Sequence, residues 1–270
     1  MKTEKTLKKY SEKRVTVIES LLQKPVQKYT SVTFHKLRVE IKKLNALFEL
    51  VSYCSKDFKR KKTFKPFKSI FRQAGKVREL QLEEAMLKKY NFQSSLKDYE
   101  NSLKTQRLGE QKDFFSAANK KSSDKLQKRY ERLVPFFKYT GKKKVNDYMQ
   151  KKQKEIETLL AQKVLQTEQI HELRKGLKNF YYNRKSLALP EQNAQPAEED
   201  ILPELLGNWH DNQVIIRHFT KAIDANGMKP QQASRLEIIK AKLSSENKTL
   251  LTKIHAALPS SELYNQTQKA

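Results

Sequence analysis

The chain of 270 residues contains a single cysteine, Cys54, and few helix-breaking residues, with only six glycines and eight prolines. One cysteine excludes an intramolecular disulfide and is typical of proteins from a reducing compartment. The scarcity of glycine and proline disfavours a turn-rich β architecture, whereas the abundant Lys, Glu, Gln and Leu are good helix formers. The composition therefore predicts an all-α fold.

Long apolar runs are also missing from the sequence. No segment has the roughly 18 consecutive apolar residues that a transmembrane helix needs. The first ten residues are basic and polar and lack the apolar stretch of a secretory signal peptide. We therefore expect no membrane insertion and a cytoplasmic location, and the sequence makes no prediction about the oligomeric state.

Acidic residues are scarce relative to basic ones. Lys and Arg number 56 against 30 Asp and Glu, which gives a formal net charge of +26. Because such an excess opposes compaction by self-repulsion, a folded protein that carries it usually binds a polyanion. Residues 1–135 have a net charge of +19 and residues 136–270 one of +7, so the first half should supply most contacts. Composition leaves open whether the polyanion is nucleic acid, an anionic membrane surface or a phosphate polymer.

Apolar residues recur at helical spacing along most of the chain, which argues against disorder. Amphipathic helices are expected at about residues 4–24, 31–55, 63–90, 94–120, 122–139, 143–164, 167–188, 200–225 and 230–257. The proline- and acid-rich segment 188–203 is expected to be a solvated loop, and the run 59–62 a basic loop.

Two motifs occur twice, in the same order. The segment HKLRVEIKKLN at 35–45 recurs as HELRKGLKNFY at 171–181, an offset of 136 residues. The segment GKVRELQL at 75–82 recurs as GNWHDNQV at 207–214, an offset of 132 residues. Two motifs repeated in order at nearly the same spacing indicate a duplicated helical unit. We expect two similar bundles, residues 1–139 and 140–270, that face each other across a shared cleft.

Each copy of the first motif predicts a helix with a basic face and an apolar face. At about 100° per residue, His35, Arg38, Lys42 and Asn45 share one narrow face. In the second copy, His171, Arg174, Lys178 and Tyr181 do the same, and Lys65, Lys68 and Arg72 repeat the basic spacing on another helix. The separate apolar stripes must pack inward, and they contain Leu37, Ile41, Leu44, Phe48 and Val51 in the first copy and Leu173, Leu177, Phe180 and Leu187 in the second.

An ordered basic face suits an extended phosphate chain, since successive side chains can each meet a different phosphate. Arginine presents planar paired donors to phosphate oxygens, and lysine adds a mobile point charge. The alternative for any single lysine is an ordinary solvated surface position. For His35 and His171, two roles stay open: direct contact with phosphate, or a buried position that orients a neighbouring group.

At these residues the sequence resembles the CHAD family, the conserved-histidine α-helical domain. The resemblance rests on the duplicated H-x-x-R-x-x-x-K segment, each copy followed by a G-x-x-R or G-x-x-x-D segment, and it runs from about Lys5 to Leu258. It implies that the whole chain is one CHAD domain. Two four-helix bundles would be related by pseudo-twofold symmetry and separated by a basic groove. It further implies binding of inorganic polyphosphate and a location at polyphosphate granules.

The residues expected to bind polyphosphate combine those carried over by the resemblance with their basic neighbours. Three positions depart from the family pattern, because Asn45, Asn179 and Tyr181 stand where basic residues are usual. Glu79 and Gln81 likewise replace the usual aspartates of the first copy. The full expected set is His35, Arg38, Lys42, Lys43, Lys65, Lys68, Arg72, Arg78, His171, Arg174, Lys175 and Lys178.

Catalysis is not expected, and neither is a cofactor or a metal site. The chain has no E-x-E-x-K strand motif, no phosphate-binding glycine loop and no second set of ligands to complete a metal site with His210 and Asp211. Nucleic-acid binding is the alternative function, since the electrostatics are the same. Aromatic residues such as Tyr53 and Trp209 could stack on bases, but most lie at helical spacing with Leu and Ile, which favours core packing.

Overall fold

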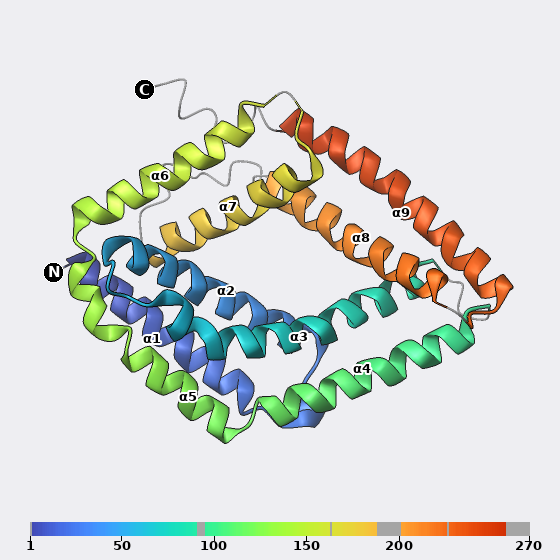
Figure 1. Cartoon of the computed structure of the whole chain (residues 1–270), viewed down its shortest axis with the longest axis horizontal. Coiled ribbons are helices and arrows are strands. Elements are labelled where there is room, and N and C mark those ends of the chain that lie inside the picture. The colour runs from blue at the N-terminus through green and yellow to red at the C-terminus, as the bar shows by residue number, and fades with distance from the viewer. Residues whose placement is uncertain (1, 91–94, 163, 188–200, 226, 258–270) are drawn as a thin grey trace. The chain divides into compact units, whose positions relative to one another are not determined.

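The computed structural model describes residues 2–90, 95–162, 164–187, 201–225 and 227–257, and every regular element in these ranges is a helix (Figure 1). The predicted all-α class is confirmed. The elements are α1 Lys2–Leu22, η1 Val26–Lys28, α2 Ser31–Cys54, α3 Arg60–Lys89, α4 Lys97–Ala117, α5 Lys120–Glu131, η2 Val134–Tyr139, α6 Lys142–Leu160, α7 Thr167–Ser186, α8 Ile201–Asp224 and α9 Pro230–Ala257. None of the described helices is long and apolar enough to cross a membrane.

Local capping sets the two ends of α2, the helix that carries the first motif. Thr30 and Thr33 form a reciprocal capping box, in which each backbone N–H donates to the other side chain. At the other end, Lys144 Nζ donates to the Cys54 carbonyl at 2.9 Å. A lysine at a helix C-terminus also complements the helix dipole. These caps fix the register that places His35 in the second turn.

Three predicted segments differ from the structure in informative ways. The run 59–62 was predicted to be a loop, but α3 begins at Arg60. The predicted helix 122–139 ends at Glu131, and a separate 3-10 helix follows that has Pro135 in its first turn. The loop predicted for 188–203 lies outside the described residues up to 200, and α8 begins at Ile201. Pro203 fits there because first-turn N–H groups have no intrahelical partner.

The described residues form two compact units. Unit 1 contains those within 1–76, 110–156 and 175–194, and unit 2 those within 77–109, 157–174 and 195–270. Each unit contains residues from both halves of the sequence, and four helices contribute residues to both units: α3, α4, α6 and α7. The division at residue 139 and the cleft expected between the repeats stay predictions.

Unit 1 has a core rich in phenylalanine. Phe34 lies 4.8 Å from the ring of Tyr29 and 5.0 Å from that of Phe114, centroid to centroid. Phe48 lies within 5.8 Å of both Phe58 and Phe67. The apolar stripe predicted for α2 is confirmed, since its five side chains are fully buried: Leu37, Ile41, Leu44, Phe48 and Val51.

Unit 2 is built around the antiparallel pair α8 and α9, which lie side by side (Figure 1). Trp209 is fully buried, as the core interpretation of the aromatic residues predicts. One apolar cluster joins these helices to α3 and α4, and it contains Leu80, Leu87, Leu96, Leu103, Ile215, Phe219, Leu236, Ile239 and Leu243.

Unit 2 also contains a polar cluster that joins α3, α4 and α8. His218 of α8 places Nδ1 2.7 Å from Glu83 and Nε2 3.5 Å from Glu79, both on α3. Tyr99 of α4 donates a hydrogen bond to the other oxygen of Glu83, whose side chain is 2% exposed. Hydrogen bonds to Glu79 and Glu83 raise the pKa of His218 to about 9, although burial opposes protonation. The imidazolium form therefore links α3 to α8 at neutral pH.

This linkage predicts that the free energy of unfolding depends on pH. The folded-state pKa of His218 is about 9, and the unfolded value is about 6.5. The stabilisation is therefore fully present below about pH 6.5 and is lost as the pH rises through about 9. Urea unfolding at about pH 6 and pH 9.5 measures this loss of stability. In His218→Gln the difference in unfolding free energy between the two pH values should be much smaller than in wild type. An equal loss in wild type and variant would show that other groups cause it.

Candidate functional site

The basic face of α2 lies in unit 1 and meets Phe71 of α3. His35 is exposed, and Arg38 and Lys42 are half-buried. The Arg38 guanidinium carbon lies 4.2 Å from the centroid of the Phe71 ring, and Lys42 Nζ lies 5.7 Å from it. Both cations thus gather over one aromatic face, a favourable arrangement for positive charge. The structure brings together two of the residues that helical spacing predicted.

Gly75, the first residue of the second motif, lies in contact with Arg38. Arg38 Nη1 donates to the Phe71 backbone carbonyl at 2.9 Å, and the guanidinium lies against Gly75. A Cβ atom at position 75 would be 3.2 Å from the guanidinium carbon and closer still to Nη1. Gly75 therefore leaves room for Arg38 on the surface of α3. Its counterpart Gly207 has no such role, since a Cβ there meets no described atom within 4 Å.

Lys43 is held differently from Lys42. Its Nζ lies 2.8 Å from Glu40, and Arg14 of α1 lies 2.8 Å from the other oxygen of that carboxylate. The Glu40 side chain is only 5% exposed. Lys43 is therefore part of an ion-pair cluster that joins α2 to α1. Sequence reasoning missed Arg14, which lies in no motif, and Glu40, which lies inside the first motif at a position where the motif specifies no residue type.

The remaining basic residues predicted on α3 lie along one helix. Lys65, Lys68 and Arg72 are exposed and belong to unit 1. Arg78 is half-buried and belongs to unit 2. Lys68 is three residues before Phe71 and seven before Gly75, so it shares their helical face.

The second copy of the first motif lies on α7. In unit 2, the half-buried His171 ring packs 4.9 Å from Trp209 and edge-on at 5.3 Å from His210. Both roles considered for His171 stay predictions. Arg174 is half-buried in the same unit. Lys175 is exposed and Lys178 half-buried, and both belong to unit 1.

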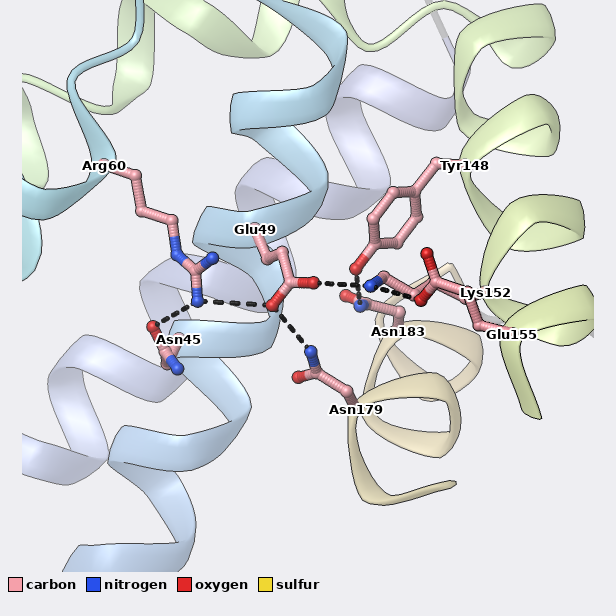
Figure 2. A network of polar contacts seen from close by, with 8 residues as sticks. All are labelled: Asn45, Glu49, Arg60, Tyr148, Lys152, Glu155, Asn179 and Asn183. Atoms are coloured by element: carbon pink, nitrogen blue, oxygen red, sulfur yellow. Dashed lines mark hydrogen bonds and ion pairs between the residues drawn. The ribbon is translucent and has the colours of Figure 1, made fainter. Parts of the chain in front are cut away.

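An acidic residue, Glu49, occupies the same face of α2 and was missed by sequence reasoning. Figure 2 shows its carboxylate at the centre of a polar network. Lys152 of α6 lies 2.9 Å from one oxygen, and Arg60 of α3 lies 3.2 Å from the other. Asn179 of α7 donates to that second oxygen at 2.8 Å, and Arg60 also donates to Asn45 at 3.1 Å. Helical spacing from Lys42 could have found Glu49, but nothing in the sequence marks its partners.

Burial opposes ionisation of Glu49, but the hydrogen bond and charge of Lys152 and the charge of Arg60 outweigh it and lower its pKa. Burial likewise opposes protonation of Lys152, whose hydrogen bonds to Glu155 and Glu49 nevertheless raise its pKa. Both groups are therefore charged at neutral pH. The described residues contain no group of three or more His, Cys, Asp or Glu placed to hold a metal ion.

Comparison with known proteins defines the class to which this helical fold belongs. Over 95% of this chain and 91% of the other, the fold matches the crystal structure of the CHAD domain from the plant Ricinus communis, with a TM-score of 0.75 and 13% identity. PptA from Streptomyces chartreusis matches over 94% of this chain and 98% of its own, with a TM-score of 0.66 and 12% identity. At such identities these two likenesses show the fold alone.

The family itself is shown by the sequence. The CHAD domain model matches residues 30–189, which is more than half of the chain. The protein belongs to the CHAD domain family, as the duplicated motifs predicted. No curated protein matches the chain significantly.

The contrast between Gly75 and Gly207 yields a prediction about stability. Replacing glycine by alanine inside a helix stabilises it by up to about 1 kcal/mol. We expect this gain for Gly207→Ala, whereas Gly75→Ala should gain less because Arg38 loses its bond to Phe71, a contribution of about 0.5–1.5 kcal/mol. Urea unfolding gives both values. In an Arg38→Ala background the two alanine variants should become equally stabilising; a persistent difference would contradict this role for Gly75.

Proposed function

We propose that this chain binds inorganic polyphosphate through the basic side chains of α2, α3 and α7, as a binding protein without catalytic activity. The observation that carries the proposal is the twice-repeated histidine–arginine–lysine spacing in a member of the CHAD family. The net charge of +26 supplies the long-range attraction for a polyanion.

The geometry around Phe71 supports this function on physical grounds. The ring and carbonyl of Phe71 hold the Arg38 guanidinium in one orientation. A preorganised guanidinium loses less conformational entropy when it binds an anion than a mobile side chain does. The exposed Lys65, Lys68 and Arg72 continue the basic surface along α3, where each can meet a different phosphate.

Polyphosphate binding also implies where the protein would act. A chain that binds long phosphate polymers would gather at cytoplasmic polyphosphate granules, where that ligand is concentrated. The spacing of the basic residues suits an extended ligand, since the Cβ atoms of residues three and four positions apart on a helix lie about 5–6 Å from one another. Neighbouring cations can therefore contact neighbouring parts of one extended chain.

Nucleic acid is the second candidate ligand, and one exposed aromatic residue favours it. Tyr53 is 43% exposed, and Lys151 Nζ lies 5.9 Å from the centroid of its ring. An exposed tyrosine beside a lysine can stack on a base while the cation meets a phosphate. Trp209 offers no such platform because it is fully buried.

A double variant tests the binding residues. Arg38→Gln with Arg174→Gln should weaken binding of long-chain polyphosphate about 100-fold, since each lost charge-assisted hydrogen bond contributes about 1.5 kcal/mol. The matched control is Lys248→Gln with Lys253→Gln, which removes the same charge from exposed positions of α9. Isothermal titration measures the affinities, and circular dichroism checks that the helices persist. Equal weakening in both pairs would reduce the site to general charge attraction.

A competition titration separates the two ligand classes. Long-chain polyphosphate, single-stranded RNA and duplex DNA are compared at physiological salt with matched phosphate concentrations. Polyphosphate should win by more than about tenfold, which corresponds to about 1.4 kcal/mol. Equal competition by all three ligands, with the same salt dependence, would contradict selective polyphosphate binding.

A further inference from the structure

The basic face of α2 contains one acid in register with its cations. Glu49 follows Lys42 by seven residues and Arg38 by eleven, and both spacings keep the same side of a helix. At the offset of 136 residues that relates the two motif copies, position 49 corresponds to Lys185. The second copy is thus basic where the first is acidic.

Three hydrogen-bond donors from three other helices converge on the Glu49 carboxylate. They are the guanidinium of Arg60, the ammonium of Lys152 and the side-chain amide of Asn179 (Figure 2). Guanidinium, ammonium and amide groups are also the donors with which proteins bind phosphate oxygens. The arrangement therefore has the chemistry of a phosphate site, with a carboxylate of the chain in the place of the anion.

The surroundings of the network keep its donors in position. Lys152 Nζ lies 5.9 Å from the centroid of the Tyr148 ring, and buried Asn183 donates to the Tyr148 hydroxyl at 3.2 Å. Asn45 accepts a hydrogen bond from Arg60. Because Arg60 and Lys152 are 32% and 20% exposed, solvent can reach them. An anion from solution can thus approach cations whose positions are already set.

Local charge explains why the carboxylate matters for binding. Arg60 and Lys152 carry two positive charges, and Glu49 and Glu155 balance them. The basic surface is therefore locally neutral at this point. A phosphate chain that extends along α2 past Lys42 has no net attraction here unless it replaces Glu49 at the two cations.

We propose that Arg60, Lys152 and Asn179 form a phosphate subsite that Glu49 fills in the free protein, and that a polyphosphate chain displaces this carboxylate as it extends along α2. This inference rests on the proposed function and assigns that site a further subsite. A free phosphate ion must compete with a tethered carboxylate of high effective concentration, whereas a long chain already bound at Arg38 competes on equal terms. Glu49 thereby selects long phosphate chains over short ones.

Two glutamine variants test the subsite. Glu49→Gln removes the competing charge. The control, Glu155→Gln, removes the same charge from Glu155, which also pairs with Lys152 but is 48% exposed. Glu49→Gln should tighten binding of long-chain polyphosphate roughly tenfold, the order expected for one additional charge-assisted hydrogen bond to the ligand. It should tighten tripolyphosphate binding by a larger factor, so the difference in affinity between long and short chains becomes smaller. Glu155→Gln should change either affinity by less than about threefold.

The outcomes separate the subsite from the proposed function. If wild type binds polyphosphate and Glu49→Gln binds no tighter than Glu155→Gln, the subsite is overturned and the function stands. If Glu49→Gln binds and wild type does not, the carboxylate blocks the site and the subsite is supported. If neither binds while circular dichroism shows folded helices, the proposed function and the subsite fall together.

A second pair of variants covers the case in which Glu49→Gln does not fold. Arg60→Gln with Lys152→Gln should weaken long-chain binding about tenfold more than Lys61→Gln with Lys151→Gln does, because only the first pair removes the converging donors. The control pair removes the same charge from exposed neighbours on the same two helices. Equal weakening by the two pairs overturns the subsite.

Discussion

The sharing of buried and half-buried carboxylates between helices is the interaction on which this strongly basic chain depends. Glu40 joins α2 to Arg14 of α1, Glu49 joins α2 to Arg60 and Lys152, and Glu83 joins α3 to His218. With 56 basic and 30 acidic residues, an acid placed between cations relieves repulsion where the helices come together. Removing one partner of such a buried pair leaves an uncompensated charge and costs about 3–5 kcal/mol. The acidic side chains between the helices of each unit thus offset part of the repulsion among its many basic residues.

Helical periodicity predicted how the motif helix divides its surface, because burial follows directly from spacing. All five apolar residues expected on the inner stripe of α2 are buried, and His35, Arg38 and Lys42 lie off that stripe. Periodicity could not predict that Arg38 lies on Phe71 and against Gly75, because that arrangement depends on how α2 packs on α3. The motif therefore shows that a glycine occurs at position 75, and only the packing of the helices explains why a glycine is needed there.

Tertiary contacts also change the meaning of the departures from the family pattern. In the sequence alone, Asn45 and Asn179 stand out as positions that have no basic residue where the family usually has one. In the structure, both belong to the network around Glu49. Arg60 was assigned to a basic loop, and instead it begins α3 and reaches that network. A basic residue is lost at position 45 along the helix, and Arg60 from another helix brings a guanidinium to the same place. Such compensation crosses between elements and leaves no local signal in the sequence.

The two copies of the motif use similar residues for different contacts. In the first copy His35 is exposed and Arg38 rests against Phe71, whereas in the second His171 packs against Trp209. Under the proposed function, the two copies are expected to contribute unequally to anion binding, in the direction that the net charges of +19 for residues 1–135 and +7 for residues 136–270 indicate. If Glu49 must leave its cations when a phosphate arrives, binding at this point exchanges one anion for another. In this exchange the phosphate gains the cations that the carboxylate loses, so the net change in neutralised negative charge is small. Binding here therefore contributes less to the salt dependence than binding to a cation with no acidic partner does. The salt dependence of binding should therefore reflect fewer cations than the number that touch the ligand.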